Sequence, residues 1–274
     1  SGTTISEVVT DGEAQYKCIK ALAEKYPTAA SVTIMDLSLE AEAFGSNTIY
    51  SEHEVPTVIG HIIDSEESAQ NLQVPEVGAG RTGAYLEAAR LAAEGINDRP
   101  VFGVHIGPYS LAGRLMDMTE IMIQLMIDPD YVKLVLEKCT EFLVEFAKAF
   151  KKQGVDGIII AEPAAGLLSP EKCHEFSSVY VKRIVEAVQD ESFAVILHNC
   201  GNAEKLVDTM VSTTAKGLHF GNAVDMKVIM PQVPEDIIAF GNIEPSGVFK
   251  HGSPEDMKNA VTTLLNDMKP YKNF

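Results

Sequence analysis

Two short aliphatic runs, Gly157-Ile158-Ile159-Ile160-Ala161 and Ala194-Val195-Ile196-Leu197, decide the fold class of this chain. Strands of a parallel sheet that is covered on both faces have nearly continuous apolar sequences of this kind. Along the rest of the chain, runs rich in valine and isoleucine alternate with longer amphipathic stretches, which is typical of repeated β-α-β units. The predicted strands cover residues 29–38, 100–108, 154–163, 192–201, 216–222 and 237–245.

Three helix starts are marked by one signal, a capping side chain followed by proline at the first helical position. They are Asp128-Pro129, Ser169-Pro170 and Ser253-Pro254. The helix that begins after Asp128 carries apolar side chains at helical spacing, so we expect it to pack against the outside of the sheet. Cys139 falls within this apolar stripe, and we predict that it is a core residue.

The length of the chain favours one large domain. It has 274 residues, of which 46% are hydrophobic, and a (β/α) barrel alone needs about 250 residues. We therefore expect residues 1–274 to form a single barrel domain around one core.

Charge and cysteine content exclude several classes of protein. The chain has 39 acidic against 22 basic residues and a formal net charge of −17, so nucleic acid and anionic membranes would be repelled. No apolar run approaches the ~18 residues of a membrane-spanning helix, and the first residues do not begin a signal peptide. Four cysteines without CxxC spacing suit a reducing compartment. We expect a cytoplasmic protein that binds neither nucleic acid nor membranes.

Polar residues follow the apolar part of all six predicted strands, and they are the main indication of function. The carboxyl ends of parallel strands lie on the same side of a sheet, so these side chains should meet at one mouth of a barrel. The candidates are Asp36, His105, Glu162, His198 with Cys200, Asn222 and Asn242. Any single one of them is equally explained by the polar residues that every α/β protein places where strands become loops.

His198 and Cys200 have the spacing of a metal site. Side chains two apart on a strand point to the same face, so an imidazole and a thiol there can bind one zinc ion. A catalytic zinc normally has three protein ligands, so at least one more is needed. Glu162 is a candidate, either as a ligand or as a group that orients one. His105 either lines the mouth or is a core histidine bonded to the backbone.

One motif is set aside. Residues 78–83, Gly-Ala-Gly-Arg-Thr-Gly, match the GxGxxG pattern of dinucleotide-binding sites. Such a site needs a buried strand directly before the glycines, and residues 71–76 do not read as one. We interpret the segment as a loop that leads into a helix over Ala84–Ala93.

In combination, several of these motifs resemble the uroporphyrinogen decarboxylase superfamily. They are residues 35–45 (MDLSLEAEAFG), Gly107-Pro108-Tyr109-Ser110, Glu162-Pro163, His198-Asn199-Cys200-Gly201 and Gly241-Asn242-Ile243-Glu244-Pro245. Within the superfamily they are most similar to the cobalamin-dependent methyltransferases that methylate thiols such as coenzyme M. The resemblance extends over nearly the whole chain.

The resemblance implies a reaction as well as a fold. In these methyltransferases zinc is bound by His-x-Cys, matched here by His198 and Cys200, and by a later cysteine. The zinc activates a small thiol, which attacks the methyl group of a methylcobamide carried by a separate corrinoid protein. Asp36 is then expected to position substrate and Glu162 to be a fourth ligand or its neighbour. The substrate-binding candidates are His105, Asn222 and Asn242.

Two other functions stay open. A metal-free decarboxylase or lyase of the same superfamily would act on a tetrapyrrole or a small carboxylate, with Asp36 as its key residue. The arginine motif with which decarboxylases hold substrate carboxylates is absent here. The third possibility is a protein that binds a corrinoid or tetrapyrrole without catalysis.

The expected fold is a TIM-type (β/α)8 barrel without its first and last strands. Only six strands are predicted, and a barrel lacking two would leave long unpaired edges, which proteins avoid. We therefore expect the natural chain to contain further terminal residues. By the resemblance, the third zinc ligand would be a cysteine beyond Phe274.

Overall fold

The structure of the chain is a computed structural model that describes residues 2–274. Its centre is a six-stranded parallel sheet in the order β1-β4-β5-β6-β7-β8. The strands are β1 (Ser31–Val32), β4 (Val101–Ile106), β5 (Gly157–Ala161), β6 (Ala194–Asn199), β7 (Gly217–Phe220) and β8 (Ile238–Phe240). Each lies within one of the six predicted ranges, so the predicted parallel α/β sheet is confirmed.

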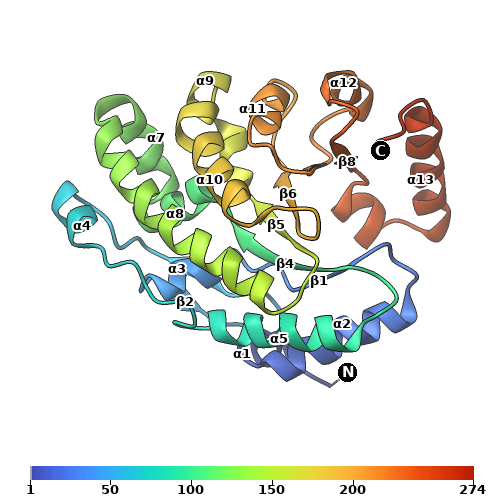
Figure 1. Cartoon of the computed structure of the whole chain (residues 1–274), viewed down its shortest axis with the longest axis horizontal. Coiled ribbons are helices and arrows are strands. Elements are labelled where there is room, and N and C mark those ends of the chain that lie inside the picture. The colour runs from blue at the N-terminus through green and yellow to red at the C-terminus, as the bar shows by residue number, and fades with distance from the viewer. Residues whose placement is uncertain (1) are drawn as a thin grey trace.

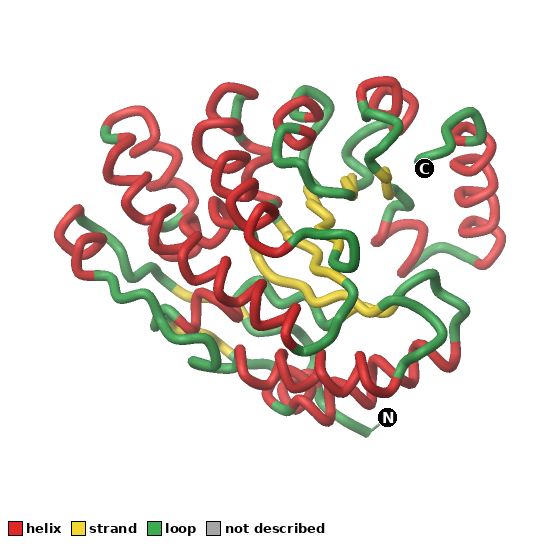
Figure 2. The backbone as a smooth tube through the Cα atoms, viewed as in Figure 1, coloured by secondary structure: helices red, strands yellow, loops and turns green. Residues whose placement is uncertain are grey.

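The sheet is curved into a half-barrel with helices along its outer side. Figure 1 shows these helices following one another from α2 and α5, through α8 and α10, to α13, and Figure 2 shows the strands as one curved layer. The helices are α2 (Gly12–Lys25), α5 (Thr82–Gly95), α8 (Pro129–Lys152), α10 (Val179–Val188), α11 (Val207–Val211), α12 (Met226–Ile229) and α13 (Pro254–Met268). This is the arrangement of six of the eight units of a TIM-type barrel, with β1 and β8 as the edges.

Shorter elements extend the loops between these units. They are α1 (Ile5–Thr10), α3 (Leu39–Ala43), the antiparallel pair β2 (Asn47–Ile49) and β3 (Thr57–Ile59), α4 (Glu66–Asn71), α6 (Pro108–Met116), α7 (Met118–Ile127), η1 (Pro163–Leu167), α9 (Pro170–Cys173), η2 (His174–Ser178), η3 (Met230–Gln232) and η4 (Pro245–Lys250). Among residues 2–274, no helix is both long and apolar enough to cross a membrane.

The three predicted helix caps are present. Asp128 accepts a hydrogen bond from the backbone N–H of Tyr131, and Ser169 and Ser253 each accept one three residues into their own helix. In α8 the predicted apolar stripe faces the sheet, with Cys139 fully buried in it. Each buried aromatic side chain of this stripe contributes roughly 1.5–3 kcal/mol to the stability of the fold.

The two faces of the sheet can be told apart by two glycines. A side chain on Gly103 would collide with the ring of Phe150 in α8, so Gly103 faces the outer helices. A side chain on Gly217 would meet Ile196 and Phe240, so these positions share the inner, concave face. Because side chains alternate along a strand, every second residue of β4 counted from Gly103 faces the outer helices. Every second residue of β6 and β7, counted from Ile196 and Gly217, faces inward.

Candidate functional site

His198 lies on the inner face near the carboxyl end of β6. It is two residues after Ile196, and it pairs in register with Ala161 of β5 and His219 of β7. The rings of His198 and His219 are neighbours, with centroids 4.5 Å apart and planes tilted by 40°. His219 was not among the predicted site residues, although it ends an apolar run just as His198 does.

Both imidazoles are held in the neutral form. Burial lowers the pKa of His198, and the nearby backbone of His219 only partly offsets this. Burial, together with repulsion from His198, lowers the pKa of His219 to about 4. A neutral imidazole has a lone pair available for a metal ion or for a proton.

Cys200 follows β6 directly and is solvent-exposed at the same end of the sheet as His198. The backbone of Cys200 lies against Gly221, where any side chain would collide with it. Asn199, between His198 and Cys200, is buried, and its side-chain oxygen accepts a hydrogen bond from the N–H of Gly201 at 2.8 Å. The tripeptide therefore ends the strand in a fixed turn that leaves the thiol accessible.

Glu162 is a helix cap. One carboxylate oxygen accepts the backbone N–H of Tyr109 at 3.0 Å, and the other accepts both the N–H, at 2.6 Å, and the hydroxyl of Ser110. These donors form the first turn of α6, where the helix dipole favours a negative charge. Burial nevertheless raises the pKa of Glu162 to about 7, against the effect of these hydrogen bonds. Both oxygens accept hydrogen bonds from α6, and the backbone N–H of Glu162 donates to the carbonyl oxygen of His198 at 2.9 Å, which favours the predicted role of a neighbour over that of a zinc ligand.

His105 belongs to the core. It shares the outer face with Gly103, and its ring lies 6.3 Å from that of Phe146 in α8. The ring nitrogen Nδ1 is 2.7 Å from the carbonyl oxygen of Ile106, and burial lowers the pKa of the imidazole to about 4. The alternative of a backbone-bonded core histidine therefore replaces the predicted substrate-binding role.

Asp36 lies in a closed polar network rather than at an open mouth. Its side chain is 0% exposed, and one oxygen accepts hydrogen bonds from Arg81, at 2.6 Å, and from the hydroxyl of Tyr85, at 3.2 Å. The other oxygen accepts both the N–H and the hydroxyl of Ser38. Arg81 also contacts Glu42 at 2.9 Å. The expectation that Asp36 touches substrate is thereby corrected, since its carboxylate holds protein groups.

Arg81 comes from the GxGxxG segment that was set aside. As predicted, residues 71–76 contain no strand, and a helix, α5, follows the glycines. The loop delivers the guanidinium of Arg81 into the network around Asp36, with Ser38 as a further partner at 3.0 Å. This segment therefore has a structural role that the motif search did not indicate.

Glu40 is a fully buried carboxyl group beside this network. One oxygen accepts the N–H of Ile106 at 3.1 Å, and the other has no hydrogen-bond partner within residues 2–274. Burial raises the pKa of Glu40 from 4.5 to about 8. Folded protein therefore keeps this proton at neutral pH, whereas unfolded protein releases it.

A pH titration of stability tests this state of Glu40. Between pH 4.5 and pH 8 the folded chain binds one proton more than the unfolded chain, so the free energy of unfolding falls as pH rises. Glu40→Gln keeps the acceptor and removes the titration. We expect the variant to be more stable than wild type at pH 8, by on the order of 1–3 kcal/mol, and equal to it near pH 5. The exposed control Glu24→Gln should keep the wild-type pH profile. The prediction is contradicted if urea unfolding gives Glu40→Gln the same dependence of the unfolding free energy on pH as wild type and this control.

The two asparagines differ in their surroundings. Asn242 donates from its amide nitrogen to the carbonyl oxygens of Gly221, at 2.9 Å, and Val224, at 2.6 Å, so it ties together the loops after β7 and β8. Asn222 is exposed in the first of these loops. Asn242 thus has a structural role through its amide nitrogen, and the substrate contacts of Asn242 and Asn222 stay predictions.

His198 and Cys200 fit a zinc ion as part of a ligand set. Nδ1 of His198 is buried and has no hydrogen-bond partner in the part of the chain that the structure describes. An unpartnered buried nitrogen is costly unless it binds something, and zinc is commonly bound by histidine nitrogen together with cysteine thiolate. Over residues 2–274, however, no three His, Cys, Asp or Glu side chains converge into a metal site.

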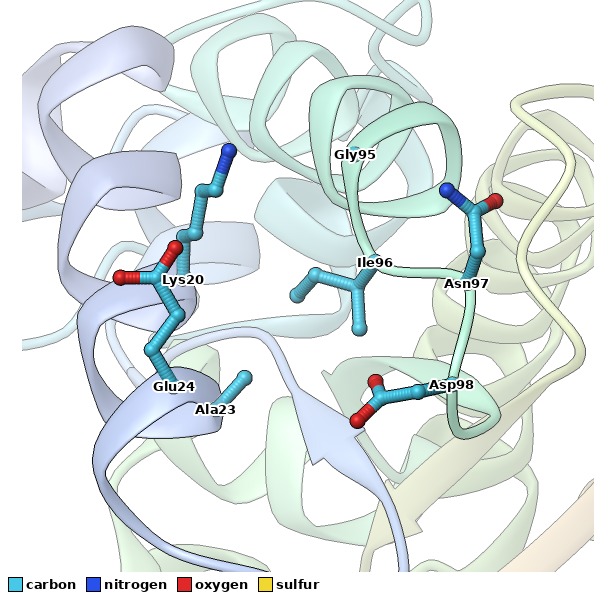
Figure 3. A pocket seen from close by; sticks show the side chains of 7 residues that line it. All are labelled: Lys20, Ala23, Glu24, Gly95, Ile96, Asn97 and Asp98. Atoms are coloured by element: carbon cyan, nitrogen blue, oxygen red, sulfur yellow. The ribbon is translucent and has the colours of Figure 1, made fainter.

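A cavity of about 390 Å³ lies at the opposite end of the sheet. It is formed where α2 and α5 end, before the chain enters β1 and β4. Figure 3 shows Lys20 and Glu24 on one side of it, and Ile96, Asn97 and Asp98 on the other. In barrel enzymes the active site is at the carboxyl ends of the strands, so this cavity is not a candidate for the reaction.

Comparison with known proteins relates this chain to a single family. The family model described as uroporphyrinogen decarboxylase (URO-D) matches residues 1–274. The methylcobamide:CoM methyltransferase MtbA of Methanosarcina acetivorans is 31% identical over 235 residues, which cover 84% of this chain and 69% of that protein. A uroporphyrinogen decarboxylase of Hydrogenovibrio crunogenus is 23% identical over 253 residues, which cover 88% of this chain and 70% of that protein.

A solved structure shares the fold. A methyltransferase from Methanosarcina mazei superimposes with a TM-score of 0.89 over 97% of this chain and 80% of that chain, at 23% sequence identity. At this identity the likeness confirms the architecture alone.

Proposed function

Because the chain belongs to the uroporphyrinogen decarboxylase family, we propose that it is one of the methyltransferases of that family. It transfers a methyl group from a methylated corrinoid, carried by a partner protein, to a small thiol. His198 and Cys200 are ligands of a zinc ion at the carboxyl end of β6. The observation that carries this proposal is the buried, unpartnered Nδ1 of His198 on the inner face, two residues before an exposed thiol.

Two observations favour this function over a metal-free decarboxylase. The methylcobamide:CoM methyltransferase relative is 31% identical to this chain, against 23% for the decarboxylase relative. In addition, the carboxylate of Asp36, on which a decarboxylase would depend, is closed off by Arg81, Tyr85 and Ser38. A carboxylate with all these partners has little capacity left to bind a substrate.

The residues of this chain prepare the site for a soft metal and a thiol. Burial keeps His198 and His219 neutral, so no cationic imidazole repels a metal ion there. The fixed turn at Asn199 and Gly201 holds Cys200 at the strand end. A zinc ion bound there would lower the pKa of a substrate thiol and so supply a thiolate nucleophile at neutral pH. Asn222 is exposed near the same rim and is proposed to contact substrate.

The test is a methyl-transfer assay combined with metal analysis. Loss of methylcobalamin absorbance is followed with protein that has been stripped of metal and then reloaded with zinc, in the presence of 2-mercaptoethanesulfonate. We expect demethylation only with zinc-loaded protein and thiol together. Metal-independent carbon dioxide release from a tetrapyrrole carboxylate would instead establish the decarboxylase, and corrinoid binding without methyl transfer to any thiol would establish the binding protein.

A further inference from the structure

Arg114 is an arginine without an acidic partner in an acidic protein. Each of the other four arginines pairs with a carboxylate within 3 Å, namely Arg81 with Asp36, Arg90 with Glu87, Arg99 with Asp98 and Arg183 with Glu137. Arg114 makes neither an ion pair nor a side-chain hydrogen bond with any residue in the range 2–274. With 39 acidic residues in the chain, an unpaired guanidinium is unexpected.

Arg114 also lines a cavity. A space of about 300 Å³ lies between the segment after β1, the strand β3 and the segment before it, and the last turn of α6. Its lining residues comprise five apolar residues, the polar residues Ser38 and Thr57, and one charged residue, Arg114. None of the lining residues is acidic. The cavity therefore combines an apolar wall with an uncompensated positive charge.

The cavity belongs to the functional end of the sheet. Met35 and Leu37, which line it, follow the carboxyl end of β1, and His198 lies at the carboxyl end of β6. Only β4 and β5 separate β1 from β6, so the strand ends next to the two sites are roughly 14 Å apart along the sheet, at about 4.8 Å per strand. A large substrate such as a corrinoid can reach both places, whereas a two-carbon thiol is much shorter than this separation.

We propose that this cavity is a binding site for an oxyanion attached to an apolar body, with Arg114 as the residue that binds the anion. Guanidinium groups donate paired hydrogen bonds to phosphate, sulfonate and carboxylate oxygens, and the apolar wall accommodates the carbon atoms next to them. The identity of the ligand at this site rests on the proposed function. The oxyanion belongs either to the phosphate of the corrinoid nucleotide tail, which the separation favours, or to the anionic end of the acceptor thiol.

Binding of unreactive probes tests the site without turnover. Ethanesulfonate and inorganic phosphate are titrated into wild type, Arg114→Gln, Arg114→Lys and the control Arg183→Gln, whose guanidinium pairs with Glu137 on the surface. We expect Arg114→Gln to bind these anions at least about tenfold more weakly, because charge-assisted hydrogen bonds are lost. Arg114→Lys should bind with intermediate affinity, because it keeps the charge but not the paired hydrogen bonds, and the control should equal wild type. The lysine variant also preserves the favourable charge in the last turn of α6. Equal anion binding by wild type and Arg114→Gln overturns the site.

A second pair of measurements identifies the source of the oxyanion. Methylcobalamin is compared with methylcobinamide, which lacks the nucleotide phosphate, and 2-mercaptoethanesulfonate is compared with 2-mercaptoethanol. Within each pair, wild type and Arg114→Gln are compared for the difference in affinity between the two compounds. The pair whose difference disappears in Arg114→Gln contains the ligand, and the inference is overturned if both differences persist. If Arg114→Gln transfers methyl groups and binds the anions as wild type does, this site is refuted and the proposed function is not. If wild type binds the anions more tightly than Arg114→Gln but no methyl transfer is found, only the proposed function is refuted.

Discussion

Arg81→Met is expected to lower the free energy of unfolding by about 3–5 kcal/mol, the cost of leaving a buried charge without its partner. The side chains of Asp36 and Arg81 are 0% and 6% exposed, and their atoms Oδ2 and Nη1 are 2.6 Å apart. Methionine fills much of the space but donates no hydrogen bond, so Asp36 and Glu42 lose their shared cation. Urea unfolding followed by circular dichroism measures the loss.

A matched control separates this effect from the general loss of an arginine. Arg90 in α5 also contacts two carboxylates, but it is 37% exposed, so Arg90→Met should lose much less stability than Arg81→Met. The double variant Asp36→Asn with Arg81→Met should recover part of the lost stability, because it removes the unpaired charge. Equal losses for Arg81→Met and Arg90→Met would show that the network around Asp36 is not a buried ion-pair system.

Removing either proposed zinc ligand is expected to abolish activity. His198→Ala and Cys200→Ser should each weaken zinc binding by more than about 100-fold, since even the loss of a residue that only hydrogen-bonds to a metal ligand costs about 10–100-fold. Methyl transfer from methylcobalamin should fall to the background rate. Zinc affinity is measured by competition with a chelator, and fold integrity by circular dichroism.

The controls for this prediction are a histidine and a cysteine elsewhere in the chain. His53 is exposed in a loop, and Cys18 is a partly buried residue of α2. Neither belongs to β6 or to the turn that follows it, so His53→Ala and Cys18→Ser should keep both zinc affinity and activity. A His198→Ala variant that retains its zinc and its activity would exclude the proposed site.

The sheet was predictable because its strands carry a strong local signal. The apolar runs of β5 and β6 can be recognised without any long-range information, and Asp128, Ser169 and Ser253 mark helix starts by their own side chains. The hairpin of β2 and β3 was missed because both strands have only three residues. Such short strands carry no usable periodicity.

The face of each strand was not predictable, and this explains most of the corrections at the site. In a strand covered on both sides, apolar residues occupy both faces, so alternation does not reveal which way His105 points. Its outward direction follows from the packing of Gly103 on Phe150. Long-range partners were equally hidden, since Asp36 meets an arginine 45 positions later. His219 required knowledge of the register between β6 and β7.

Cobalt(II) substitution tests the central claim most directly, because its absorption spectrum reports the donor atoms without any need for turnover. Wild-type protein loaded with cobalt is expected to show a thiolate-to-cobalt charge-transfer band. That band should disappear in Cys200→Ser, and cobalt binding should weaken strongly in His198→Ala. A cobalt spectrum without a thiolate band, or one that is unchanged in Cys200→Ser, would contradict the proposal that His198 and Cys200 together form the metal site.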